Sequence, residues 1–273
     1  MSVLFSVQSV CLSAALCIFA LGAQAHEFWI EPEDYTVATG DSVIARFRNG
    51  ETFEGSSLSW IPGRSKRFDM VSGGVVAPVP ARLGDNPALA LDAPSEGLLT
   101  ILHETADQRL TYKEWAKWVK FTDHKDVAFA QDSHLDRGLP ETGFREAYRR
   151  FAKSLIAVGD GQGADVAQGL RTEFVLGANP YTDDLSAGLP VQILFEGAPK
   201  ANAQIEVFDK APDGAVEVTL YRADAEGRAV LPVTEGHAYL LDSVTLLPLE
   251  PEEDGDPVWY TLWAALTFAV PEG

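Results

Sequence analysis

The residue with the most distinctive chemistry is His26, which follows the small-x-small triplet Ala23-Gln24-Ala25 in the stretch LGAQAHEFWIEP. The first 25 residues carry no charged side chain and are mostly apolar, a composition typical of a secretory signal peptide. If the chain is cut after Ala25, His26 becomes the first residue and presents an α-amine beside its imidazole. These two nitrogens can close a six-membered chelate, and nitrogen-rich sites favour Cu(II) or Ni(II) over Ca²⁺ or Mg²⁺.

A third nitrogen ligand must come from one of the four other histidines. We expect it at His103, which ends the apolar run LLTILHE, or at His237, which precedes AYLLDSV, because sites are often built from loops at strand ends. Each also has a plain structural interpretation, as a strand-end or turn residue bonded to backbone or water. His124 and His134 fall in a helical stretch and are interpreted as surface residues.

Other common chemistries lack their usual motifs. The chain has no CxxC, HExxH, P-loop or GxSxG pattern, which argues against zincin, thiol, nucleotide and α/β-hydrolase chemistry. The acidic run LEPEEDGDP matches no EF-hand spacing and is interpreted as a solvated hairpin tip. We therefore expect a protein that is not an enzyme.

Charge and cysteine content limit the compartment and the partners. The net charge of −19 argues against nucleic-acid binding, which needs a basic surface, and is explained by solubility. Both cysteines, Cys11 and Cys17, lie in the first 25 residues, so the mature chain has no disulfide. The signal peptide predicts a periplasmic protein.

Hydrophobic patterning predicts a mainly β protein with two antiparallel, immunoglobulin-like β-sandwich modules and a helical insertion between them. Alternating apolar residues and Asn-Gly or Gly-Gly turns favour strands before residue 108 and after residue 186. Helical spacing predicts one helical region from Thr111, with a capping box to Glu114, and a second helix over ETGFREAYRRFAKSLIAVG. The expected organisation is a signal peptide (1–25), an N-terminal sandwich (26–108), the helical insertion (109–160), a connector (161–185) and a C-terminal sandwich (186–273).

Several ordered segments resemble a known family: AHEFWIEP, LTYKEWAKW, EAYRRFAKSLIAVG, TEFVLGANPY, GLPVQILFEGAPKANAQIEVF and YLLDSV…LWAALTFAV. Together they resemble the domain-of-unknown-function family 4198, over nearly the whole mature chain. The resemblance implies a secreted protein associated with nickel or cobalt importers and a metal site that includes His26. The family pattern places a histidine late in the penultimate strand, where this chain has Thr245.

Three functions follow from these observations. The first is a periplasmic protein that binds nickel, cobalt or copper through His26, His103 and His237 and supports uptake by a membrane transporter. The second is a non-catalytic protein- or glycan-binding module, which exposed aromatic residues among Trp259, Tyr260 and Trp263 would favour. The third, ranked last, is a copper-dependent oxidase. The sequence leaves the oligomeric state open.

Overall fold

A computed structural model describes residues 26–273 of the chain, and the predicted signal peptide lies outside this range. The described chain is built mainly from β-strands, as predicted, with two short α-helices. No helix in the described part is long and apolar enough to cross a membrane.

A ten-stranded mixed sheet forms the centre of the molecule, with the strand order β15-β14-β17-β18-β10-β8-β5-β6, and with β2 and β9 also paired to β10. Strands β10 and β18 run parallel, and Arg150 lies opposite Trp263 in their register. The strands of this sheet are β2 (Thr36–Val37), β5 (Ser65–Ser72), β6 (Val75–Pro78), β8 (Gly97–Thr105), β9 (Gln108–Tyr112), β10 (Phe144–Val158), β14 (Gln204–Lys210), β15 (Val216–Arg222), β17 (Ala238–Pro248) and β18 (Pro257–Ala269).

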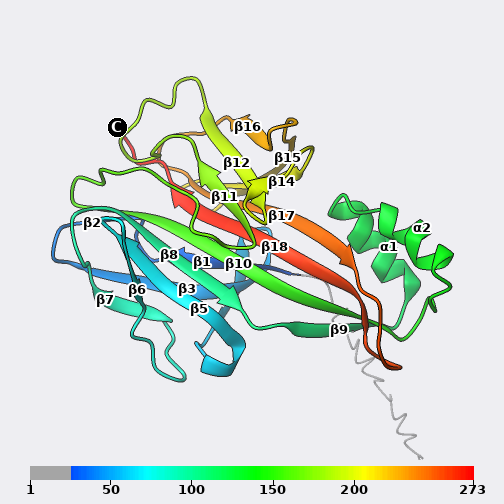
Figure 1. Cartoon of the computed structure of the whole chain (residues 1–273). Helices are drawn as coiled ribbons and strands as arrows, with labels where there is room; N and C mark the ends of the chain where they lie inside the picture. The colour runs from blue at the N-terminus through cyan, green and yellow to red at the C-terminus, as the bar shows by residue number, and fades with distance from the viewer. Residues whose placement is uncertain (1–25) are drawn as a thin grey trace, which may run out of the picture.

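Two smaller sheets pack against opposite faces of the central sheet (Figure 1). The first contains β1 (Glu27–Pro32), β3 (Ser42–Glu51), β4 (Glu54–Leu58) and β7 (Leu89–Asp92). The second contains β11 (Thr172–Leu176), β12 (Leu189–Phe195), β13 (Ala198–Pro199) and β16 (Arg228–Leu231). A short 3-10 helix, η1, spans Pro62–Arg64.

Alternation along the central strands creates these two cores. On β14, Phe208 packs into the core beneath the β1-β3 sheet, whereas Val207 packs into the core beneath the β11-β12 sheet. Because side chains on a strand alternate between faces, Glu206 shares the face of Phe208. Its carboxylate therefore faces the side of the central sheet on which β1 lies.

The predicted helical stretch forms a hairpin of α1 (Trp115–His124) and α2 (Phe129–Asp136). Its apolar side chains, among them Trp118 and Phe121, pack against Trp259 and Trp263 of β18. The capping-box prediction is wrong, because Thr111 pairs with Arg145 in the β9–β10 ladder and Glu114 at the N-cap makes no side-chain cap bond. The hairpin covers one end of the long strands (Figure 1).

The second predicted helix is wrong, because residues 144–158 form the fifteen-residue strand β10. Phe144, Tyr148, Phe151 and Leu155 fit a helical repeat, but the same segment also alternates, with Phe144 buried and Arg145 exposed at its start. From Phe151 to Val158 every residue is buried, since sheets cover both faces there. Periodicity alone cannot separate such a strand from a helix. Strands from both predicted modules are joined through β10 into one sheet.

Candidate metal-binding site

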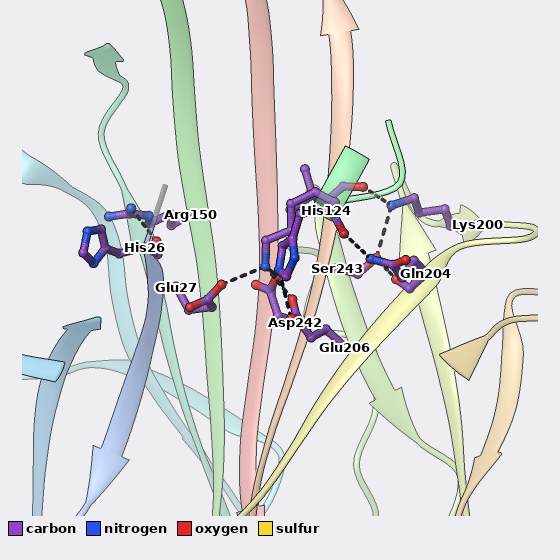
Figure 2. Close-up of polar contacts among 11 residues, drawn as sticks. His26, Glu27, His124, Arg150, Lys200, Gln204, Glu206, Asp242 and Ser243 are labelled. Carbon is purple, nitrogen blue, oxygen red and sulfur yellow. Dashed lines mark hydrogen bonds and ion pairs between the residues drawn. The ribbon is translucent and has the colours of Figure 1, made fainter. Parts of the chain in front are cut away.

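Three buried carboxylates converge at the junction of β1, the helical hairpin and the central sheet. Glu27 begins β1, Glu206 lies on β14, and Asp242 lies opposite Glu206 on β17. One oxygen from each carboxylate lies within 4.8 Å of the other two. We call Glu27, Glu206 and Asp242 the carboxylate cluster (Figure 2).

The ammonium of Lys125 lies at the point where the carboxylate cluster converges. It donates to Glu27 Oε1 at 2.7 Å, to Glu206 Oε2 at 2.5 Å and to Asp242 Oδ2 at 3.1 Å. Trp263 lies beneath the ammonium, with its ring centroid 5.0 Å from Nζ. Burial alone disfavours the charged lysine, but the three carboxylates outweigh it and raise the pKa of Lys125 above its ordinary value.

One ammonium does not balance three carboxylates, and Asp242 shows the consequence. Burial, with the nearby charges of Glu27 and Glu206, raises the pKa of Asp242 to about 7 even though Lys125 opposes the shift. Its Oδ1 atom has no hydrogen-bond partner among the described residues. The cluster therefore holds Asp242 in a poorly hydrated position that favours its protonated form.

His124, at the last position of α1, lies beside the cluster. Its Nε2 atom is 3.1 Å from Glu206 Oε1, and the side chain is 55% exposed. The hydrogen bond to Glu206 raises the pKa of His124. In the neutral ring, donation from Nε2 leaves the lone pair on Nδ1, which is how a carboxylate orients a metal-binding histidine. His124 thus offers an accessible nitrogen.

His26 immediately precedes Glu27, and its main chain is held in place. Arg150 Nη2 donates to the His26 carbonyl oxygen at 2.8 Å, while the Glu27 side chain reaches Lys125. Figure 2 shows the His26 ring beside Arg150, with Glu27 between that ring and the rest of the cluster. The residue that would become the amino terminus is therefore anchored at its carbonyl end.

His103 lies in the core beneath the β1-β3 sheet and not at a loop. Its ring contacts the rings of Phe28, Phe47 and Phe68, and Nε2 lies 2.8 Å from Ser65 Oγ. Burial lowers the pKa of His103 to about 3, so the ring is neutral. Among residues 26–273 no hydrogen bond or ring contact joins His103 to His26. Its predicted role as a ligand remains a prediction.

His237 lies in the loop before β17 and pairs with a different carboxylate. Its Nδ1 atom lies 2.6 Å from Asp209 Oδ1, and Tyr239 donates to Asp209 Oδ2 at 3.0 Å. Asp209 pairs with Tyr239 across β14 and β17, on the face opposite the carboxylate cluster. The structure does not bring His237 to His26, and its metal role also remains a prediction.

His134 is a core residue, contrary to its interpretation as a surface histidine. It is fully buried; Nδ1 accepts from Trp259 Nε1 at 3.0 Å and Nε2 lies 3.0 Å from the Pro140 carbonyl oxygen. Both ring nitrogens therefore have structural partners. Of the aromatic residues that would favour a protein- or glycan-binding module, Trp259 and Trp263 are buried, at 0% and 3% exposed, whereas Tyr260 is partly exposed.

Sequence reasoning missed most of the cluster. Glu27 is recognisable as a possible oxygen donor because it follows His26, but Lys125, Glu206 and Asp242 come from three distant segments. Alternation in AQIEVFDK offers one signal: Glu206 lies on the face of Phe208, the face that must be buried beneath β1. An acidic residue at a buried position indicates a paired or functional group.

The donors at this junction suit a divalent ion of borderline softness. Imidazole and amine nitrogens suit nickel, cobalt, copper and zinc, and carboxylates add charge and oxygen donors. The carboxylate cluster already contacts the Lys125 ammonium, so the nitrogen donors left for an ion are His26, which lies beside Arg150, and His124, which pairs with Glu206. The residues fit a transition metal at the rim of the cluster.

Comparisons with known proteins identify the family to which the chain belongs. No curated protein matches the chain. A solved structure described as the tetra-tandem repeat in the extending region of a large adhesion protein is similar at 10% sequence identity and a TM-score of 0.21. That similarity covers 89% of this chain and 49% of the other, so the chain spans about half the length of that protein. A family model matches residues 23–246, and the chain therefore belongs to the family described as Domain of unknown function (DUF4198).

Proposed function

We propose that the processed protein binds a divalent transition-metal ion, nickel, cobalt or copper, at the start of β1. The amine and the imidazole of His26 supply the first two ligands. The observation that carries this proposal is that the next residue, Glu27, is part of a buried cluster of three carboxylates with only one ammonium among them. The chelating terminus would thus lie next to a buried group of three carboxylates.

Anchoring of the terminus favours tight chelation. Arg150 holds the His26 carbonyl, and Glu27 is held by Lys125, so the His26 backbone loses little further freedom when a metal binds. Preorganised ligands raise affinity because less conformational entropy is lost on binding. Cleavage after Ala25 is required, since the amine does not exist in the precursor.

His124 is the proposed further nitrogen ligand in place of His103 and His237. Glu206 orients its ring, and the side chain is accessible. His124 has a second connection to the central sheet, because Gln204 Nε2 donates to its carbonyl oxygen at 2.8 Å. Glu206 and Gln204 thus fix the position of His124 at the end of α1.

The proposal includes the compartment and the partner. The signal-peptide composition of residues 1–25 supports a periplasmic location, where the protein would hold a metal ion before a membrane transporter takes it up. The family resemblance supports nickel or cobalt as the cargo. Trp259 and Trp263 are buried, so Tyr260 is the partly exposed aromatic residue of the three that would favour the alternative, a protein- or glycan-binding module.

The test is calorimetric titration of nickel, cobalt and copper into protein whose first residue is shown by mass spectrometry to be His26. We expect one ion per chain. Affinity should fall by more than about 100-fold in His26→Ala, and equally when the α-amine of His26 is acetylated, which removes one of the two chelating nitrogens. His124→Ala should weaken binding, and His237→Ala should leave it unchanged.

Different outcomes separate the possible sites. Unchanged affinity in both His26→Ala and the acetylated protein would contradict the proposal. Loss of affinity only in His103→Ala or His237→Ala would place the ion at a ligand predicted from the sequence alone. Thermal melts of each variant in the absence of metal identify any loss that comes from misfolding.

A further inference from the structure

A second site lies at the opposite end of β1 from the carboxylate cluster. A cleft of about 410 Å³ opens between the β1-β3 sheet and the end of β14, a volume within the range of small-molecule sites. We call it the β1–β14 cleft. Its lining includes Tyr35, Arg46, Arg48, Phe53, Lys210 and Pro212.

An aromatic ring lines the cleft, and an unusual backbone conformation positions it. Phe53 is 1% exposed and packs edge-on against Trp29, with ring centroids 5.6 Å apart. Thr52 and Phe53 form the turn between β3 and β4 with φ angles of 54° and 56°. Residues other than glycine rarely adopt this left-handed conformation, and where they do the strain is often kept for function.

Three cationic side chains line the cleft beside two carboxylates. Arg48 Nε pairs with Glu31 Oε2 at 2.5 Å, and Arg46 pairs with Glu33. Lys210 Nζ lies 3.7 Å from Glu31 Oε1, beyond hydrogen-bonding distance, and 5.1 Å from the centroid of the Phe53 ring. The cleft therefore has a surplus of one positive charge in a chain whose net charge is −19.

The carboxylates hold the guanidinium groups in position without using all of their hydrogen-bonding capacity. A guanidinium has five N–H donors in a planar fork, and the pair with Glu33 engages only Nη1 of Arg46. The side chains of Arg46, Arg48 and Lys210 are between 27% and 30% exposed. Each is accessible to a ligand and yet held by its neighbours.

We infer that the β1–β14 cleft binds a small organic carboxylate with an apolar or aromatic body. The ligand's carboxylate pairs with Lys210 and the adjacent guanidinium groups, since charge-assisted and bidentate contacts to carboxylates are among the strongest hydrogen bonds in proteins. Its apolar body packs on Pro212 and on the partly exposed ring of Tyr35, which also line the cleft. This site shares no residue with the metal site at the start of β1, and neither proposal depends on the other.

Benzoate is the probe, followed by the shifts of backbone amide signals in the ¹⁵N-labelled mature protein. We expect saturable shifts for Lys210, Ala211 and Arg48. Acetate, which lacks the ring, should bind at least about tenfold more weakly, and benzyl alcohol, which lacks the charge, should not bind. These two controls separate the contribution of the charge from that of the ring.

Two lysine variants provide the matched comparison. Lys210→Met keeps a long side chain over Phe53 and should weaken benzoate binding about tenfold or more. Lys113→Met removes an exposed lysine elsewhere and should leave it unchanged. The inference is overturned if wild-type protein shows no saturable shift, if benzyl alcohol binds as well as benzoate, or if Lys210→Met binds like the wild type. Amide spectra of the unliganded variants verify that each is folded.

Discussion

Glu27 and Lys125 are joined by an ion pair of 2.7 Å although they lie 98 positions apart in the chain. The pair fixes the first residue of β1 to the C-terminal end of α1, so the start of the mature chain and the helical hairpin hold one another. Glu206 and Asp242 complete the arrangement from the central sheet. The carboxylate cluster is therefore a structural junction as well as the charged base of the proposed metal site.

Replacing Lys125, the buried cation of this junction, should destabilise the protein and increase the stabilisation that a metal ion gives it. Lys125→Met removes the ammonium that pairs with all three buried carboxylates, and the loss of one partner from a buried ion pair typically costs about 3–5 kcal/mol. A divalent ion can restore part of the lost charge, so nickel should raise the melting temperature of Lys125→Met by more than that of the wild type. Differential scanning calorimetry with and without nickel measures both effects.

Lys113→Met is the control for this experiment, because Lys113 is exposed and its loss should change stability by less than about 0.5 kcal/mol. If Lys125→Met were as stable as the wild type, the pairing of Lys125 with the carboxylate cluster would contribute little to the free energy of unfolding. If nickel raised the melting temperatures of Lys125→Met and the wild type equally, the metal ion would not interact with the carboxylate cluster.

His103 should make folding sensitive to acid. Burial lowers its pKa from 6.5 to about 3, so between these values the unfolded chain holds a proton that the native state lacks. Stability from this group is fully present above pH 6.5 and is lost as the pH falls. In His103→Leu, the slope of unfolding free energy against pH between 4 and 6 should decrease by about 1.4 kcal/mol per unit. Urea unfolding across that range measures it, and an unchanged slope would contradict the buried neutral ring.

Asp242 should change the pH dependence of stability in the opposite direction to His103. Burial beside Glu27 and Glu206 raises its pKa from 3.8 to about 7, so the native state holds the extra proton. This contribution is present below pH 4 and is lost as the pH rises through 7. Asp242→Asn should therefore increase the same slope between pH 4 and 6, by up to about 1.4 kcal/mol per unit. If Asp242→Asn and His103→Leu changed the slope of unfolding free energy against pH in the same direction, one of the two pKa shifts would be wrong.

The sequence identifies most strands because they alternate or end at glycine turns, and it fails where burial is two-sided. Strand β10 is buried on both faces from Phe151 to Val158, so polar residues no longer mark an outer face, and its apolar residues also fit a helix. The shared central sheet could not be predicted either. Its pairings, such as Arg150 with Trp263, join segments more than a hundred residues apart.

The candidate metal site could likewise be predicted only where the information is local in the sequence. His26 is recognisable from the sequence because a cleavage signal precedes it, and that information is local. The environment of His103 is not local, since a strand-end position and a core position look alike until the rings of Phe28, Phe47 and Phe68 surround it. The importance of His124 depends on Glu206, 82 positions later in the numbering.

A substitution in the turn between β3 and β4 should stabilise the protein without changing its fold. Thr52 is β-branched and has a φ of 54°, a conformation that costs about 1–2 kcal/mol for residues other than glycine. Thr52→Gly should therefore raise the free energy of unfolding by about 1 kcal/mol, even after the extra entropy of glycine in the unfolded chain. The control is Thr219→Gly, within strand β15, which should lower it. Destabilisation by Thr52→Gly in urea unfolding would contradict the strain at this turn.

The most direct test of the metal-binding proposal is anomalous diffraction, at the nickel absorption edge, from crystals of nickel-loaded protein that begins at His26. The account predicts one anomalous peak within bonding distance of the His26 amine and Nδ1, on the side of Glu27 and His124. A peak at His237 and Asp209, or no ordered peak in protein that calorimetry shows to be loaded, would contradict it.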